Sequence, residues 1–211
     1  MSLQTIFHLL PLIDVFAVIV FAASGALVAS RKGLDLLGFM WLAVLTGVGG
    51  GTVRDLILDT PVFWLNNAIP VAASLITALA LYFIAPLVES RYRLLLWFDA
   101  LGLALFTIAG TAKGLDHGTG TLVAVVMGVV TGSVGGIIRD IVGGEPSVVL
   151  RREIYVTAAA AGAICFALLI AIGATQITAA MTGFVITFGM RGLAIKFDLR
   201  LPAWSRSTKR R

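Results

Sequence analysis

A glycine-rich segment that ends in an Arg-Asp pair occurs twice in this chain, at an offset of 85 positions. The first copy is TGVGGGTVRD at residues 46–55, and the second is TGSVGGIIRD at residues 131–140. Glycine has no Cβ and is a poor helix former, so each run is expected to break or loosen the helix that contains it. A charged pair inside an apolar segment is expected to face the protein interior or a water-filled path.

The same offset relates residues outside the two segments, and the alignment needs no gap. The matching pairs are Asp14 and Asp99, Phe21 and Phe106, Gly25 and Gly110, Gly33 and Gly118, and Pro61 and Pro146. A fixed offset of this kind indicates an internal repeat, which decides the architecture.

Composition places the repeat in a membrane. The chain is 59% hydrophobic and 13% charged, with a mean hydropathy of +1.00, whereas a soluble domain is about 25% charged. Apolar runs close to the ~20 residues that cross a bilayer fill most of the chain. They predict an all-α integral membrane protein with seven spans, near residues 12–30, 36–58, 67–88, 95–112, 120–142, 153–173 and 175–195.

The spans predict one membrane domain over residues 1–211 with no soluble domain. Residues 12–88 form the first three-span repeat and residues 95–173 the second, followed by a seventh span at 175–195 and a basic cytoplasmic tail at 196–211. An odd number of spans per repeat inverts the second copy relative to the first, as in many transporters.

The distribution of basic residues predicts the orientation. If the N-terminus lies outside and the C-terminus lies in the cytoplasm, thirteen of the 16 Lys and Arg residues fall on the inside. Only Lys113 then lies outside, and Arg54 and Arg139 lie in the glycine segments. This bias agrees with the positive-inside rule.

Other function classes lack a signal. The basic residues sit in short connections and the tail, which argues against a nucleic-acid surface. The single cysteine, Cys165, rules out an intrachain disulfide and makes a metal cluster improbable. No hydrolytic triad or phosphate loop is recognisable, so we expect no enzyme activity, no catalytic residue and no cofactor.

The order of the spans predicts two ion pairs. The first span begins, and the second ends, on the same side, so Asp14 and Arg54 are expected to meet; by inversion, Asp99 meets Arg139. Neighbours on a helix project about 100° apart. Asp55 and Asp140 are therefore expected to serve water, a helix cap or the pathway. Alternatively, all these charges hold helices together without a role in permeation.

The glycines and hydroxyls of the two segments also have two interpretations. The glycines can open the backbone to a pathway, or they can let helices pack closely. The hydroxyls can coordinate an ion or bond a carbonyl one turn back. The candidate pore and gate residues are Thr46, Gly49, Gly50, Gly51, Arg54, Asp55, Thr131, Gly132, Ser133, Gly135, Gly136, Arg139 and Asp140.

The doubled glycine and Arg-Asp signature, with a layout of three, three and one spans, resembles the TRIC family of trimeric intracellular cation channels. The resemblance covers residues 10–200 and points to the prokaryotic branch, and hence to a plasma (inner) membrane. It implies a homotrimer with a pore in each subunit, lined by the second and fifth spans and conducting chiefly potassium. Val134 stands where the first copy has Gly49, so the second break is expected to be less flexible.

The same signature is shared by bacterial membrane proteins described as glycine-transporter domains. The first hypothesis is therefore a channel for potassium or another monovalent cation. The alternative is a secondary transporter of a small zwitterion such as glycine, and a third is a non-conducting scaffold. The basic tail is expected to attract anionic lipid headgroups.

Overall fold

The described part of the chain folds into a bundle of seven α-helices. The computed structural model describes residues 4–87, 90–147 and 153–202, with side chains from residue 11 onward. Arg151, Arg152 and residues 203–211 of the predicted basic tail lie outside the described residues.

The helices follow the predicted spans closely. Their bounds are α1 Gln4–Lys32, α2 Leu36–Ile57, α3 Ile69–Ile84, α4 Arg91–Asp116, α5 Thr121–Val142, α6 Val156–Ala171 and α7 Gln176–Phe197, with a 3-10 turn η1 at Ala85–Leu87. Six of them are long and apolar enough to cross a membrane, while α6 is apolar but has only 16 residues. The predicted all-α integral membrane fold is confirmed.

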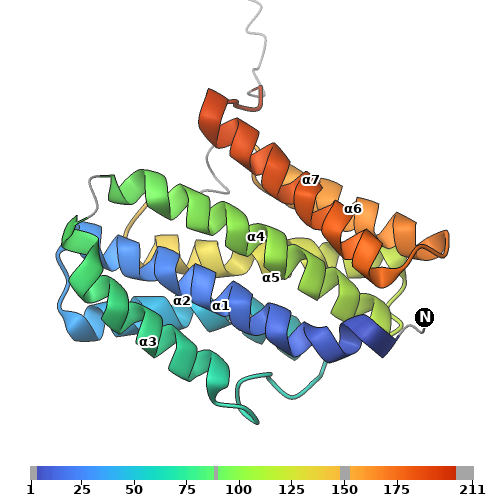
Figure 1. Cartoon of the computed structure of the whole chain (residues 1–211), viewed down its shortest axis with the longest axis horizontal. Coiled ribbons are helices and arrows are strands. Elements are labelled where there is room, and N and C mark those ends of the chain that lie inside the picture. The colour runs from blue at the N-terminus through green and yellow to red at the C-terminus, as the bar shows by residue number, and fades with distance from the viewer. Residues whose placement is uncertain (1–3, 88–89, 148–152, 203–211) are drawn as a thin grey trace, which may run out of the picture.

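Four helices make the centre of the bundle (Figure 1). Helices α1 and α2 pack together, as do α4 and α5, and contacts of α1 with α4 and of α2 with α5 join the two pairs. Helix α3 covers α1 and α2 on one side, whereas α6 and α7 lie against α4 on the other. The charged segments of α2 and α5 are therefore placed inside the bundle.

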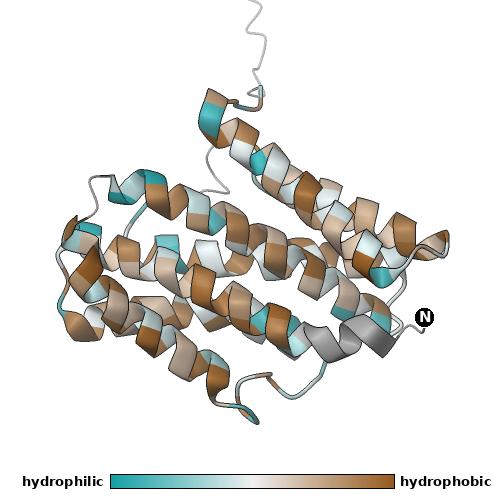
Figure 2. Ribbon diagram, viewed as in Figure 1, coloured by the Kyte–Doolittle hydropathy of each residue, from teal (hydrophilic) through white to brown (hydrophobic). Residues whose placement is uncertain are grey.

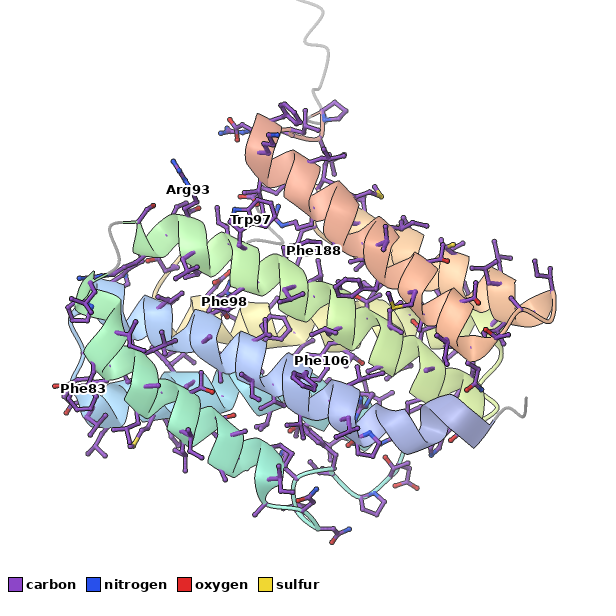
Figure 3. All side chains as sticks on the ribbon, in the orientation of Figure 1. Phe83, Arg93, Trp97, Phe98, Phe106 and Phe188 are labelled. Atoms are coloured by element: carbon purple, nitrogen blue, oxygen red, sulfur yellow. The ribbon has the colours of Figure 1, made fainter. Side chains whose placement is uncertain are left out.

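Apolar side chains cover the outside of the bundle (Figure 2). Leu37 on α2, Ile76 on α3 and Leu122 on α5 are 72%, 68% and 78% exposed. Phe83, near the end of α3, points away from the bundle (Figure 3). Surfaces of this kind are stable against lipid and unfavourable in water.

The expected breaks in α2 and α5 are absent. Both helices run without interruption through their glycines, from Leu36 to Ile57 and from Thr121 to Val142. An open turn at membrane depth would leave backbone N–H and C=O groups without partners. This cost exceeds the weak helix propensity of glycine, so the glycines must serve another purpose.

Candidate functional site

Arg54 and Asp14 meet at one end of the bundle. Arg54 Nη1 donates to Asp14 Oδ1 at 2.9 Å, and Nη2 donates to Oδ2 at 3.0 Å. Arg54 has no exposed surface and Asp14 is only 7% exposed. This two-point contact between α2 and α1 is the pair expected from the order of the spans.

Asp55 takes part in the same cluster, contrary to the expectation that its arginine neighbour would not reach it. Arg54 Nε donates to Asp55 Oδ1 at 2.7 Å, and Lys113 Nζ donates to the same oxygen at 2.8 Å. The Phe63 backbone N–H donates to Asp55 Oδ2 at 2.9 Å. The long arginine side chain bends back along α2, so a separation of about 100° does not prevent the contact. We call Asp14, Arg54, Asp55 and Lys113 the Arg54 cluster.

A second cluster surrounds Arg139 near the other end of the bundle. Arg139 Nη1 donates to Asp99 Oδ1 at 2.6 Å and to Ser24 Oγ at 3.0 Å. Arg139 Nε and Nη2 donate to Asp140 Oδ1 at 3.0 and 2.8 Å, so Asp140 also binds its arginine neighbour. Arg139 and Asp99 have no exposed surface. We call Ser24, Asp99, Arg139 and Asp140 the Arg139 cluster.

The two clusters share a plan but differ in one member each. Both join an aspartate to an arginine 40 positions later, and both include the aspartate that follows the arginine. Lys113, however, has Val28 as its counterpart at the 85-residue offset, and Ser24 has Ala109. No sequence pattern pointed to Lys113 or Ser24, because each lies far along the chain from the arginine whose cluster it joins.

The glycines of α2 and α5 permit these helices to cross in close contact. A Cβ at Gly50 would collide with the backbone carbonyl of Thr131, and a Cβ at Gly135 would lie 2.7 Å from the carbonyl oxygen of Thr46. A Cβ at Gly49 would lie 2.7 Å from Ile138 Cδ1. These glycines therefore act as small residues at a helix crossing, and they do not open the backbone.

Three further glycines of the segments let other parts of the chain approach. A Cβ at Gly132 would lie 2.6 Å from Thr107 Oγ1 and 3.0 Å from the Leu103 carbonyl oxygen on α4. Gly51 leaves room for the ring of Phe63, at 2.6 Å from the position of a Cβ. Gly136 leaves room for the hydroxyl of Tyr155, at 2.9 Å.

The hydroxyls of the segments bond carbonyls one turn back. Thr46 and Thr131 donate to Leu42 and Met127, each at 2.6 Å. Ser133 donates to the carbonyl oxygen of Val129, also at 2.6 Å. Of the two interpretations left open by the sequence, the structure thus shows the local hydrogen bond.

Tyr155 brings α6 and α7 to the Arg139 cluster, and no sequence pattern indicated this residue. Its hydroxyl is buried and has no hydrogen-bond partner among the described residues, as is also true of Asp99 Oδ2. Arg191 of α7 lies over its ring at 5.2 Å and donates to Glu153 at 2.6 Å. A chain of contacts therefore runs from α7 toward the buried charges.

The empty space beside the Arg54 cluster is much larger than the space beside the Arg139 cluster. A cavity of about 360 Å³, lined by Asp14, Phe63, Asn67, Lys113 and Asp116 among others, adjoins the Arg54 cluster. The space beside Arg139 and Asp140 measures about 10 Å³, enough for about one water molecule. In this structure the Arg54 cluster is accessible from one side, and the Arg139 cluster is almost closed.

Comparisons with known proteins point to one group. The family model described as "Glycine transporter" matches twice, over residues 11–86 and 96–171. The chain is 42% identical over 202 residues to a UPF0126 membrane protein of Vibrio cholerae, covering 93% of this chain and 83% of that protein. It is 39% identical over 199 residues to the UPF0126 inner membrane protein YadS of Escherichia coli K12, covering 92% and 95%.

A solved structure extends the likeness to the fold. The crystal structure of the TRIC trimeric intracellular cation channel orthologue from Rhodobacter sphaeroides superimposes with a TM-score of 0.88 at 47% sequence identity. The alignment covers 90% of this chain and 99% of that chain. Sequence and fold therefore agree along almost the whole length.

Proposed function

Because this chain belongs to the TRIC family of cation channels, we propose that it conducts monovalent cations, chiefly potassium, through a pathway in each subunit. The pathway runs between the two charge clusters, and α2 and α5 supply most of the ionised groups along it. The solved structures that this chain resembles are described as channels, which favours conduction over enzymatic activity or zwitterion transport.

The buried charge clusters are the observation that carries this proposal. Arg54, Asp55, Arg139 and Asp99 have no exposed surface, although charged groups at membrane depth are costly. A protein that needed only tight helix packing could fill these positions with apolar side chains at similar or lower cost. Charges kept at both ends of the same four helices are better explained by a route for ions.

The assembly and orientation belong to the same proposal. The Rhodobacter sphaeroides orthologue is described as trimeric, and we expect this chain to form a homotrimer with its pathways inside the subunits. It is an integral membrane protein, and the Escherichia coli relative is described as an inner membrane protein. We expect the same membrane, with the N-terminus outside and the C-terminus in the cytoplasm.

Anionic lipid headgroups are expected at the cytoplasmic ends of α4 and α7. A hollow of about 620 Å³ is lined there by Arg93, Trp97 and Lys196 among others, and Arg93 points away from the bundle (Figure 3). Exposed cations beside an aromatic ring at a membrane surface attract such headgroups.

Single-channel recording tests the proposal. The purified protein is fused into planar bilayers under a potassium chloride gradient, beside a reference channel that verifies the bilayers. Discrete currents that reverse near the potassium potential support a potassium channel, and reversal near the chloride potential contradicts it.

Uptake measurements test the transporter alternative. Proteoliposomes are loaded and assayed for radiolabelled glycine uptake under sodium and proton gradients. Saturable uptake in the absence of unitary currents would replace the channel by a transporter. Silence in both assays would favour the scaffold.

A further inference from the structure

A hollow lined by charges of both signs lies where α4 begins and α7 ends. Its volume is about 630 Å³, within the range of small-molecule sites. The charged residues that line it are Arg191, Arg200, Glu153 and Asp198. None of the described residues that line it belongs to the Arg54 cluster or the Arg139 cluster. We call this space the Arg191 hollow.

The four charged side chains form two ion pairs that lie side by side. Arg191 Nη2 donates to Glu153 Oε2 at 2.6 Å, and Arg200 Nη2 donates to Asp198 Oδ2 at 2.9 Å. Glu153 and Arg200 also face each other in an antiparallel backbone bridge, which places their Cβ atoms about 5 Å apart. The backbone therefore holds both signs of charge in position before any ligand arrives, which lowers the cost of binding.

Arg191 has an unused hydrogen-bond donor. The residue is only 1% exposed, and its Nε has no hydrogen-bond partner among the described residues. A buried N–H group without a partner is unfavourable, above all on a charged side chain. Arginine also binds an anionic group best through two N–H groups. A small anionic group bound against Arg191 would supply the missing partner.

Asp198 stands at a position where its side chain brings little stability. It caps α7 in the left-handed region, with φ 49° and ψ 43°, where glycine is the usual residue. A negative charge at the C-terminal end of a helix is unfavourable, and an exposed pair such as that with Arg200 contributes little. A carboxylate here is better explained as the partner of a cationic group in the hollow.

The neighbouring hollow, which Arg93 and Lys196 line, differs in charge. None of the described residues that line it is acidic, so it attracts anions. The Arg191 hollow has two positive and two negative side chains, and this balance does not favour a ligand with a large net charge. Leu96, Ile195 and Leu199 give it an apolar wall. The lining therefore suits a molecule with one positive group, one negative group and an apolar part.

We propose that the Arg191 hollow is a binding site for a zwitterion with an apolar body. The anionic group of the ligand bonds to Arg191 and Arg200. The ammonium group bonds to Asp198 and Glu153. Two sources carry this chemistry, a free α-amino acid with an apolar side chain and the headgroup of phosphatidylethanolamine. The inference is independent of the proposed channel function, because binding at this site requires no ion flow.

The first test is isothermal titration calorimetry of the detergent-purified protein with free L-leucine. N-acetyl-leucine lacks the ammonium group and leucinamide lacks the carboxylate, so each should bind at least about tenfold more weakly than L-leucine. Free glycine lacks the apolar part and should also bind at least about tenfold more weakly. Equal binding of L-leucine and N-acetyl-leucine would overturn recognition of a zwitterion.

Two variants locate the binding. Arg200→Gln and Asp198→Asn each remove a charge from an exposed side chain, so the fold should be kept. Each is expected to weaken L-leucine binding at least about tenfold. Lys196→Gln is the matched control, because Lys196 is exposed at the same end of α7 but lines the neighbouring hollow. Wild-type affinity in both Arg200→Gln and Asp198→Asn would overturn the site.

Native mass spectrometry tests the lipid source, with phosphatidylethanolamine as the probe and phosphatidylglycerol as the net-negative comparison. Preferential retention of phosphatidylethanolamine that is lost in Arg200→Gln and Asp198→Asn supports the site with a lipid headgroup as ligand. Binding of L-leucine with the same dependence supports it with a free amino acid. If neither probe binds in this way, the proposal is wrong, and the channel function is still decided separately by the current recordings.

Discussion

Gly135 of α5 lies directly against the backbone carbonyl of Thr46 on α2, where a Cβ would be 2.7 Å from the oxygen. The same relationship holds in reverse between Gly50 and the carbonyl of Thr131. Each helix thus supplies one glycine and one carbonyl to the crossing. The contact fixes the distance between the two helices that carry the arginines.

Gly135→Ala is expected to lower the stability of the protein by about 1–3 kcal/mol, because the added methyl group forces α2 and α5 apart. The change is measured as a lower melting temperature in detergent. Gly189→Ala is the control: Gly189 lies within α7, and an added Cβ would meet no other helix of the described residues within 4 Å. There the better helix propensity of alanine should leave stability equal or slightly higher. Equal melting temperatures for both variants would contradict the crossing described above.

Asp14→Asn and Asp99→Asn are each expected to destabilise the protein by about 3–5 kcal/mol, because a buried arginine loses its charged partner. Thermal unfolding in detergent measures both effects. Asp198→Asn serves as the control, since its pair with Arg200 is largely exposed, at 79% and 66% of the two side chains, and exposed pairs contribute little. If Asp14→Asn or Asp99→Asn lowers stability no more than Asp198→Asn does, these buried contacts are not needed for stability.

Lys113→Gln is expected to raise potassium conductance at low salt by about twofold or more, because the cavity lined by Asp14 and Asp116 loses its lysine and becomes more negative, which attracts potassium. The increase should fade near 1 M potassium chloride, where charges are screened within about 3 Å. The prediction is tested by measuring the unitary conductance of Lys113→Gln and wild type over a series of potassium chloride concentrations. Lys196→Gln, on the exposed end of α7, controls for general loss of positive charge. Equal conductance of Lys113→Gln and wild type at low salt would exclude Lys113 from the entrance.

Tyr155→Phe is expected to change stability by less than about 1 kcal/mol, because the hydroxyl that it removes has no partner among the described residues. The ring still lies beneath Arg191, so the contact between α6 and α7 is kept. Tyr155→Leu removes this ring contact and should cost more, by about 1–3 kcal/mol. The melting temperatures of the two variants test whether Tyr155→Leu is less stable than Tyr155→Phe. A large loss in Tyr155→Phe would mean that the hydroxyl has a bound partner, such as an ordered water.

The fold could be predicted from the sequence because it follows from two features that can be read directly along the chain. These are the length of the apolar runs and the constant offset of the repeat. The contacts Asp14–Arg54 and Asp99–Arg139 were accessible for a related reason. The order of the spans places each aspartate and arginine at a similar depth, and a buried arginine needs a counter-charge. The part of these residues in conduction stays a prediction.

Residue types alone could not predict that α2 and α5 are continuous helices. Glycine runs suggested broken helices, but the tertiary contacts of Gly50 and Gly135 with facing carbonyls decide the outcome. Glycine propensity is a weak local preference, and packing between helices overrides it. The contacts made by long side chains could not be predicted either, since no pattern along the chain links Lys113 to Asp55 or Tyr155 to the Arg139 cluster.

The difference between Lys113 and its counterpart Val28 has a consequence for the direction of current. Two halves with the same charges at both entrances would pass ions equally well either way. Lys113 adds a lysine to the Arg54 cluster that has no counterpart in the Arg139 cluster, and α7 with Arg191 packs mainly against the second half of the bundle. We therefore expect the proposed cation current to rectify, with a current–voltage relation that distinguishes the two sides of the membrane.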